Sequence, residues 1–111
     1  MSLGATLLAN GFGYLLAVGG ESLTIRGKSF IGLVALLKGE KDVARYDRSK
    51  INVSTRGASV IEIAVSDFAP NTPLGTLPQA GEVITDGNAF RHTVSDVVRN
   101  GNTALCYCKV S

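Results

Sequence analysis

The sequence is poor in the residues that usually carry chemistry. It has no tryptophan, one histidine and two cysteines among 111 residues. Nucleophilic catalysis needs a base beside a serine, cysteine or threonine, and only His92 could be a histidine base. A metal site needs several ligands at suitable spacing, which this set does not provide. The carboxylates are scattered rather than paired. We therefore expect no enzyme active site, no metal and no cofactor.

The few candidate reactive side chains are expected to be structural. Cys106 and Cys108 are spaced as C-x-C, and residues i and i+2 of a strand lie about 6.5–7 Å apart. That separation is at or beyond the usual limit for a disulfide, so the pair is interpreted as small buried hydrophobes in a reducing compartment. His92 falls in a predicted strand that places Phe90 and Val94 on the same face. It is interpreted as a partly buried or rim histidine. Cys106 could approach it, but no orienting acid stands at a diagnostic spacing.

The N-terminal stretch lacks charge but is not a membrane or secretion signal by its pattern. Residues 1–18 are mostly apolar and have no basic residue, which a secretory signal would need. Gly11 and Gly13 interrupt the run, which is also too short for a membrane span. Residues 1–19 are therefore expected to form a short helix or a packing arm.

Positive charge is concentrated in one segment of the chain. The net charge is +2, and residues 38–57 contain six basic and three acidic residues, a balance of +3. The rest of the chain has five basic and six acidic residues, a balance of −1. The segment carries one aromatic residue, whereas nucleic-acid platforms usually interleave several with lysine and arginine. A solvated loop, a protein-docking loop that orders on assembly, and a nucleic-acid contact remain open. The candidate protein-contact residues are Lys41, Arg45, Tyr46, Arg48, Lys50 and Arg56.

Short alternating apolar runs separated by glycine turns predict a β protein. Turns are predicted at 27–28, 86–88 and 100–102, while the three prolines in 67–80 exclude a helix or an interior strand there. The predicted strands are 22–26, 29–37, 58–66, 82–85, 89–98 and 103–110. The fold class expected is mainly β: a small antiparallel β-barrel or sandwich of about six to seven strands. It would form a single domain over 20–111, with long loops at 38–57 and 67–80.

The order of these pieces resembles a known family. The pieces are GESLTIRG (20–27), IAVSDF (63–68), PQAGEVI (78–84) and GNAFRHTV (87–94). Together they resemble the small head–tail joining proteins of tailed bacteriophages, in which a P-x-x-G-[DE]-x-I step leads through a glycine turn into an aromatic-led strand. The similarity covers roughly residues 20–110.

This resemblance implies a structural role in the virion. A connector or head-completion protein of this kind forms an oligomeric ring at the portal vertex of a filled capsid and offers a docking surface for the tail. The implied partners are the portal or head adaptor and the tail terminator. The implied location is the virion, with the host cytoplasm during assembly, and the isolated chain would be a monomer.

The same resemblance implies that 1–19 and 38–57 become ordered in the particle. Because 38–57 shows no family-specific motif, individual contact residues are not transferred. No membrane partner is expected, and nucleic acid would be incidental. The alternative function is a small OB-like or SH3-like nucleic-acid-binding β-barrel.

Overall fold

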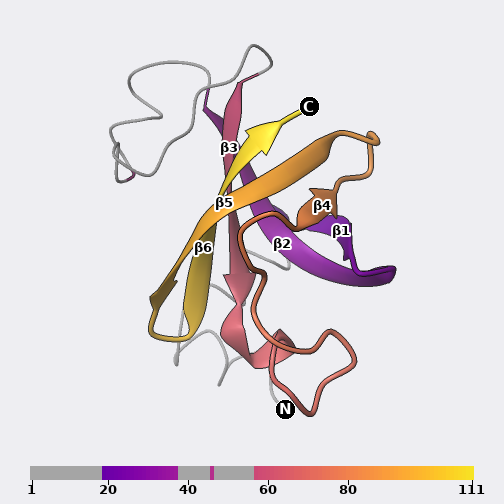
Figure 1. Cartoon of the computed structure of the whole chain (residues 1–111), viewed down its shortest axis with the longest axis vertical. Coiled ribbons are helices and arrows are strands. Elements are labelled where there is room, and N and C mark those ends of the chain that lie inside the picture. The colour runs from indigo at the N-terminus through magenta and orange to yellow at the C-terminus, as the bar shows by residue number, and fades with distance from the viewer. Residues whose placement is uncertain (1–18, 38–45, 47–56) are drawn as a thin grey trace.

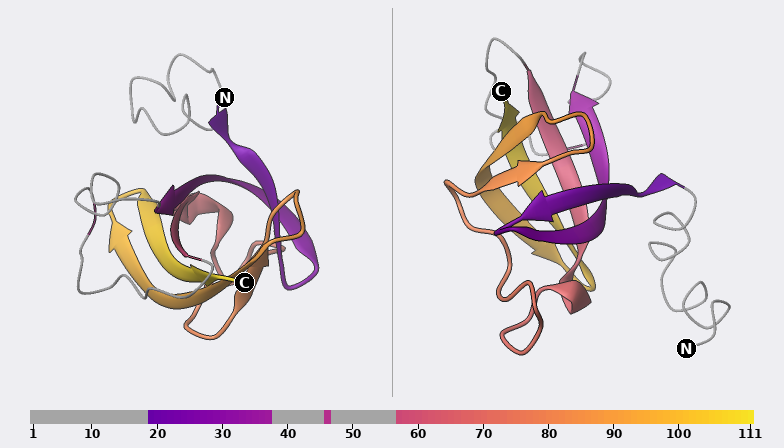
Figure 2. Two further views of the ribbon diagram at one scale, coloured as in Figure 1. Left: turned by 90° about the horizontal axis from the view of Figure 1, so that it is seen from above. Right: turned by 90° about the vertical axis from the view of Figure 1, so that its right-hand side faces the viewer.

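A computed structural model describes residues 19–37, 46 and 57–111. In this part of the chain, six strands form one closed antiparallel barrel in the order β1-β2-β3-β6-β5-β4 (Figures 1 and 2). The expectation of a mainly-β barrel is confirmed. The predicted arm at 1–19 lies outside the described residues except for Gly19, and 38–57 does so except for Tyr46 and Gly57. The strands are β1 Glu21–Ile25, β2 Lys28–Leu37, β3 Ala58–Ala64, β4 Val83–Thr85, β5 Arg91–Asn100 and β6 Thr103–Val110.

β1 and β2 form a hairpin with a two-residue turn. Ile25 pairs with Lys28, so Arg26 and Gly27 make the turn, one residue earlier than predicted. Their φ angles are 55° and 75°, as in a type I′ turn, which needs positive φ at both central positions. The glycine takes the second of these positions, and this places Arg26 at the first.

The barrel interior is filled by aliphatic side chains, two phenylalanines and both cysteines. On β3, Ile61 and Ile63 are fully buried, and they pair across to Cys106 and Ala104 of β6. Residues two apart lie on the same face of a strand, which is why both point into the barrel. The buried cluster consists of Leu23, Ile25, Phe30, Ile61, Ile63, Phe68, Ile84, Val94, Ala104, Cys106 and Cys108.

β5 departs from the predicted pattern just before it begins and again near its middle. His92 and Val94 share a face as predicted, but that face points into the core, so His92 is fully buried and the interpretation of it as a partly buried or rim histidine is wrong. Phe90 does not share this face and is 48% exposed. The prediction for Phe90 is wrong because Ala89 has a φ of 65°, which redirects the chain before β5 begins. Further along, the register shifts between Val94 and Asp96, a β-bulge that changes which residues face inward.

The bulge lets β5 keep an apolar inner face. An unbroken alternation from His92 and Val94 would turn Asp96 into the core. Instead Val97 pairs with Cys106 and packs against the core, while Asp96 pairs with Tyr107.

One end of the barrel is covered by the segment between β3 and β4. β3 ends at Ala64, two residues earlier than predicted, because a 3₁₀ turn begins at Val65. Phe68 then folds inward, with its ring edge-on to Phe30 at a centroid distance of 5.1 Å. Leu74 and Leu77 also pack against the core. The proline-containing loop predicted here therefore closes the lower end of the barrel in Figure 1.

The number of paired positions differs between neighbouring strands of the barrel. β3 and β6 are paired along seven positions, whereas β1 and β4 meet at one, Thr24 with Thr85. In the described ranges no helix is both long enough and apolar enough to cross a membrane.

Candidate functional site

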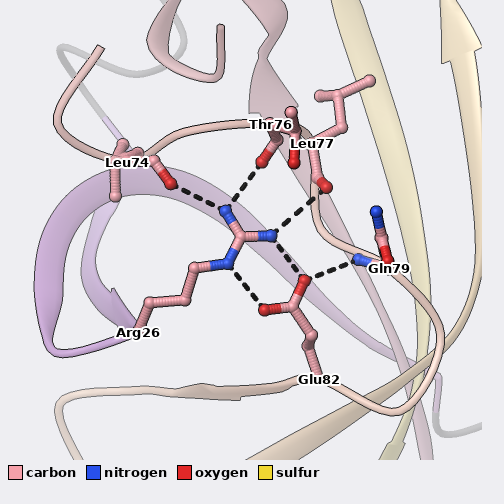
Figure 3. Close-up of polar contacts among 6 residues, drawn as sticks. All are labelled: Arg26, Leu74, Thr76, Leu77, Gln79 and Glu82. Carbon is pink, nitrogen blue, oxygen red and sulfur yellow. Dashed lines mark hydrogen bonds and ion pairs between the residues drawn. The ribbon is translucent and has the colours of Figure 1, made fainter. Parts of the chain in front are cut away.

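A charged clamp joins the β1–β2 turn to the loop before β4. The Arg26 Nε donates to Glu82 Oε2 at 2.6 Å, and its Nη2 donates to Glu82 Oε1 (Figure 3). Both side chains are 28% exposed. The hydrogen bond to Glu82 raises the pKa of Arg26 against the opposing effect of burial, and the bond from Arg26 lowers the pKa of Glu82. The pair is thus charged at neutral pH.

The Arg26 guanidinium also donates hydrogen bonds to the backbone of the loop. Nη1 of Arg26 donates to the carbonyl oxygens of Leu74 and Thr76, each at 2.7 Å, and Nη2 to that of Leu77 at 3.3 Å. Glu82 in turn accepts from the backbone N–H of Gln79 at 2.9 Å. Four backbone groups are therefore held by one ion pair, and the loop from 74 to 82 is fixed relative to the first hairpin.

Next to the clamp, residues of the 67–80 loop and of β5 line an open groove of about 420 Å³. Apolar groups dominate its lining, including the prolines at 70 and 78. Two of the residues whose carbonyls Arg26 holds also line it. The groove is lined by Phe68, Pro70, Thr76, Leu77, Pro78, Gln79, Val97 and Arg99. Arg99 is the one charged residue in this set.

A second polar arrangement lies inside the barrel and was not predicted. His92 is fully buried, with Nδ1 2.7 Å from Ser59 Oγ and Nε2 2.9 Å from Asp86 Oδ2. Asp86 Oδ1 meanwhile accepts the backbone N–H groups of Asn88 and Phe90. Asp86 therefore stabilises the predicted turn through its backbone hydrogen bonds. It is also the acidic partner of His92, which the spacing in the sequence had not identified.

Serine, histidine and aspartate in one hydrogen-bonded chain invite comparison with a catalytic triad. In a triad the acid bonds Nδ1 and the serine bonds Nε2 of the histidine. Here the two ring nitrogens have the opposite partners, and Ser59 is only 1% exposed. The three residues connect β3, β5 and the β4–β5 turn, so the chain of bonds ties the barrel together across its interior.

The cysteines have the buried, unpaired state expected of them. Cys106 and Cys108 are free, with exposures of 0% and 1%. Burial raises the pKa of each thiol to about 12. A thiol with such a pKa is almost entirely protonated at neutral pH and is a poor nucleophile. Among the described residues, no group of histidine, cysteine and acidic side chains could hold a metal ion.

Of the predicted protein-contact residues, the structure describes one. The Tyr46 ring lies edge-on to Tyr107, with a centroid distance of 6.2 Å. Tyr107 lies between the two inward-facing cysteines of β6, so it points outward, yet it is 3% exposed. Tyr46 thus contacts the outer wall of the barrel. The other predicted contact residues, Lys41, Arg45, Arg48, Lys50 and Arg56, lie outside the described residues.

Comparisons of the chain with protein-family models, curated proteins and solved structures find no match.

Proposed function

We propose that this chain is a structural adaptor that joins the head of a tailed phage, or of a prophage particle, to its tail. It would act as one subunit of an oligomeric ring at the portal vertex. The observation that carries the proposal is the ion pair between Arg26 and Glu82. Arg26 belongs to GESLTIRG and Glu82 to PQAGEVI, two of the pieces that resemble the head–tail joining proteins. Their contact supports interpreting these distant pieces as parts of one structural unit.

The distribution of polar and apolar groups also supports an assembly role. Four side chains that could act as nucleophile or base are enclosed in the barrel, namely those of Ser59, His92, Cys106 and Cys108. Among the residues that the structure describes, three large apolar side chains are exposed on the outside. Ile31, Leu36 and Phe90 are 43%, 45% and 48% exposed. Side chains of this kind are what protein interfaces bury at their centres.

A complementation assay tests the proposal. The gene is deleted from the phage or prophage that encodes the chain, and induced lysates are viewed by electron microscopy. We expect filled heads and free tails that are not joined, with joining restored by the gene supplied in trans. Joined, infectious particles in the absence of the gene would overturn the proposal.

Two variants refine the assay. Phe90→Ser, at an exposed position, should fold normally and reduce the yield of joined particles. Asn88→Ser, in the same turn and also exposed, is the matched control and should leave the yield unchanged. The nucleic-acid alternative is examined by titrating labelled single-stranded DNA at about 50 and about 200 mM salt. Tight binding that weakens steeply with salt would favour that alternative.

A further inference from the structure

The groove beside the clamp has one wall fixed in advance of any binding. Thr76 and Leu77 line it, and their carbonyl oxygens are bonded to Arg26, which is itself held by Glu82. Pro70 and Pro78 restrict the backbone of the same wall further. A preformed wall reduces the ordering cost that a ligand would otherwise pay on binding.

The groove has the size and surface of a site for a side chain with its flanking backbone. Its volume of about 420 Å³ falls within the roughly 300–1,000 Å³ typical of ligand sites. Phe68, Leu77 and Val97 give it an apolar interior, and all three also pack in or against the barrel core. Gln79, which is exposed at the edge, offers an amide that can bond an extended backbone.

The positive charge of Arg99 favours a ligand that carries a negative charge. The Nε of Arg99 donates to the Gly101 carbonyl oxygen at 3.3 Å, which orients the guanidinium. In the part of the chain that the structure describes, Arg99 has no acidic partner. Its terminal nitrogens are therefore available to a carboxylate, which arginine binds in a two-point geometry. Within the described ranges, no acidic residue lines the groove to compete with such a ligand.

We infer that this groove is a peptide-docking site for a partner protein. Its ligand is an extended segment in which a large apolar side chain stands beside an aspartate or glutamate. The apolar side chain enters between Phe68, Leu77 and Val97, and the carboxylate binds Arg99. This inference goes beyond the proposed role in head–tail joining and does not rest on it, because the groove would bind such a segment from any partner.

The test uses a display library of random peptides selected on the immobilised full-length protein. We expect enrichment of sequences that combine a large apolar residue with an adjacent acidic residue. The consensus peptide is then synthesised and titrated by NMR, where the amide signals of Leu77 and Val97 should shift. Arg99→Gln should weaken its binding about tenfold, and Arg99→Lys should restore part of the loss. Thr76→Trp, at an exposed lining position, should block the groove and abolish binding.

The control is Arg91→Gln, which makes the same charge change at an exposed position at the opposite end of β5. It should leave peptide binding unchanged. The inference is overturned if the library yields no acidic–apolar consensus. It is equally overturned if Arg99→Gln and Arg91→Gln weaken binding to the same extent, or if a single-stranded oligonucleotide displaces the peptide and binds more tightly. None of these outcomes bears on the complementation assay, so the two proposals fail separately.

Discussion

Asp86 accepts a hydrogen bond from the fully buried His92 through one carboxylate oxygen and caps its own turn through the other. One side chain thus holds both the β4–β5 connection and the polar chain inside the barrel. Its carboxylate is itself largely buried, with 8% of the side chain exposed. The two roles make Asp86 the residue through which acid should act on the fold.

Acid should destabilise the protein through Asp86. Burial raises the pKa of this carboxyl, but the bonds from His92, Asn88 and Phe90 and the charge of His92 outweigh burial, and the net pKa is lowered. In the unfolded chain an aspartate carboxyl has a pKa of about 4. Because the pKa of Asp86 is lower in the folded state, the folded state binds fewer protons than the unfolded state near this pH. The stability this gives is present above about pH 4 and is lost as pH falls through the folded pKa. Urea unfolding from pH 7 to pH 2 should show this loss.

Asp86→Asn should flatten that pH dependence while lowering stability at neutral pH. An equally steep fall below pH 4 in this variant would show that other carboxylates dominate. Glu82 is the first to test, because its pKa is also lowered, chiefly by the hydrogen bond from Arg26. Glu82→Gln is therefore measured beside it.

Ser59→Ala should be costly for such a small change. It removes the partner of His92 Nδ1 while the ring stays buried, and an orphaned buried polar group costs about 1–3 kcal/mol. The free energy of unfolding is measured by urea titration at pH 7. Ser22→Ala, at an exposed position of β1, is the control and should change stability by less than about 0.5 kcal/mol. Equal effects of the two variants would contradict the importance of the buried chain of bonds.

Arg26→Asn should separate the turn from the clamp. Asn-Gly is the favoured pair for a type I′ turn, so the β1–β2 hairpin should persist. The loop carbonyls and Glu82 lose their partner, so amide exchange at Gln79, which donates to Glu82, should become faster. Global stability should fall by only about 0–1 kcal/mol, because the pair is partly exposed. Unchanged exchange at Gln79 would mean that the prolines alone fix the loop.

Gly32→Ala should destabilise the barrel by overpacking. A Cβ at this position would lie 2.9 Å from Leu23 Cδ1 and 3.2 Å from the Glu62 carbonyl oxygen. Such crowding typically costs about 1–3 kcal/mol. Gly87→Ala is the matched control, since a Cβ there meets nothing within 4 Å. Thermal unfolding of the two variants should differ, and a Gly32→Ala protein as stable as the control would contradict the tight packing of β1 on β2.

The strands were predictable because apolar residues recur at alternate positions along them and face the inside of the barrel. Ile61 and Ile63 on β3 are examples, and both are fully buried. The local errors arose where one residue changes direction, as at Ala89 with its positive φ and at the bulge between Val94 and Asp96. Neither a left-handed alanine nor a bulge leaves a clear mark in a single sequence.

The polar contacts were less predictable, because they join residues that are distant in the chain. Arg26 and Glu82 are 56 positions apart, and Ser59 and His92 are 33. The only local sign of Ser59 was its position, two residues before Ile61 on the inward face of β3. Asp86 was recognised as a turn residue, but its second oxygen meets His92 only once β4 and β5 are paired.

The closure of the barrel at β1 and β4 has a mechanical consequence. Thr24 and Thr85 form the one paired position there, so the backbone ladder contributes least at this joint. Arg26 directly follows β1 and Glu82 directly precedes β4, which places their ion pair at the end of the same joint. The barrel thus behaves as a curled sheet whose free edges are locked together by side chains. At this seam the ion pair and the buried side chains of β1 and β4 add to a backbone ladder that is only one pair long.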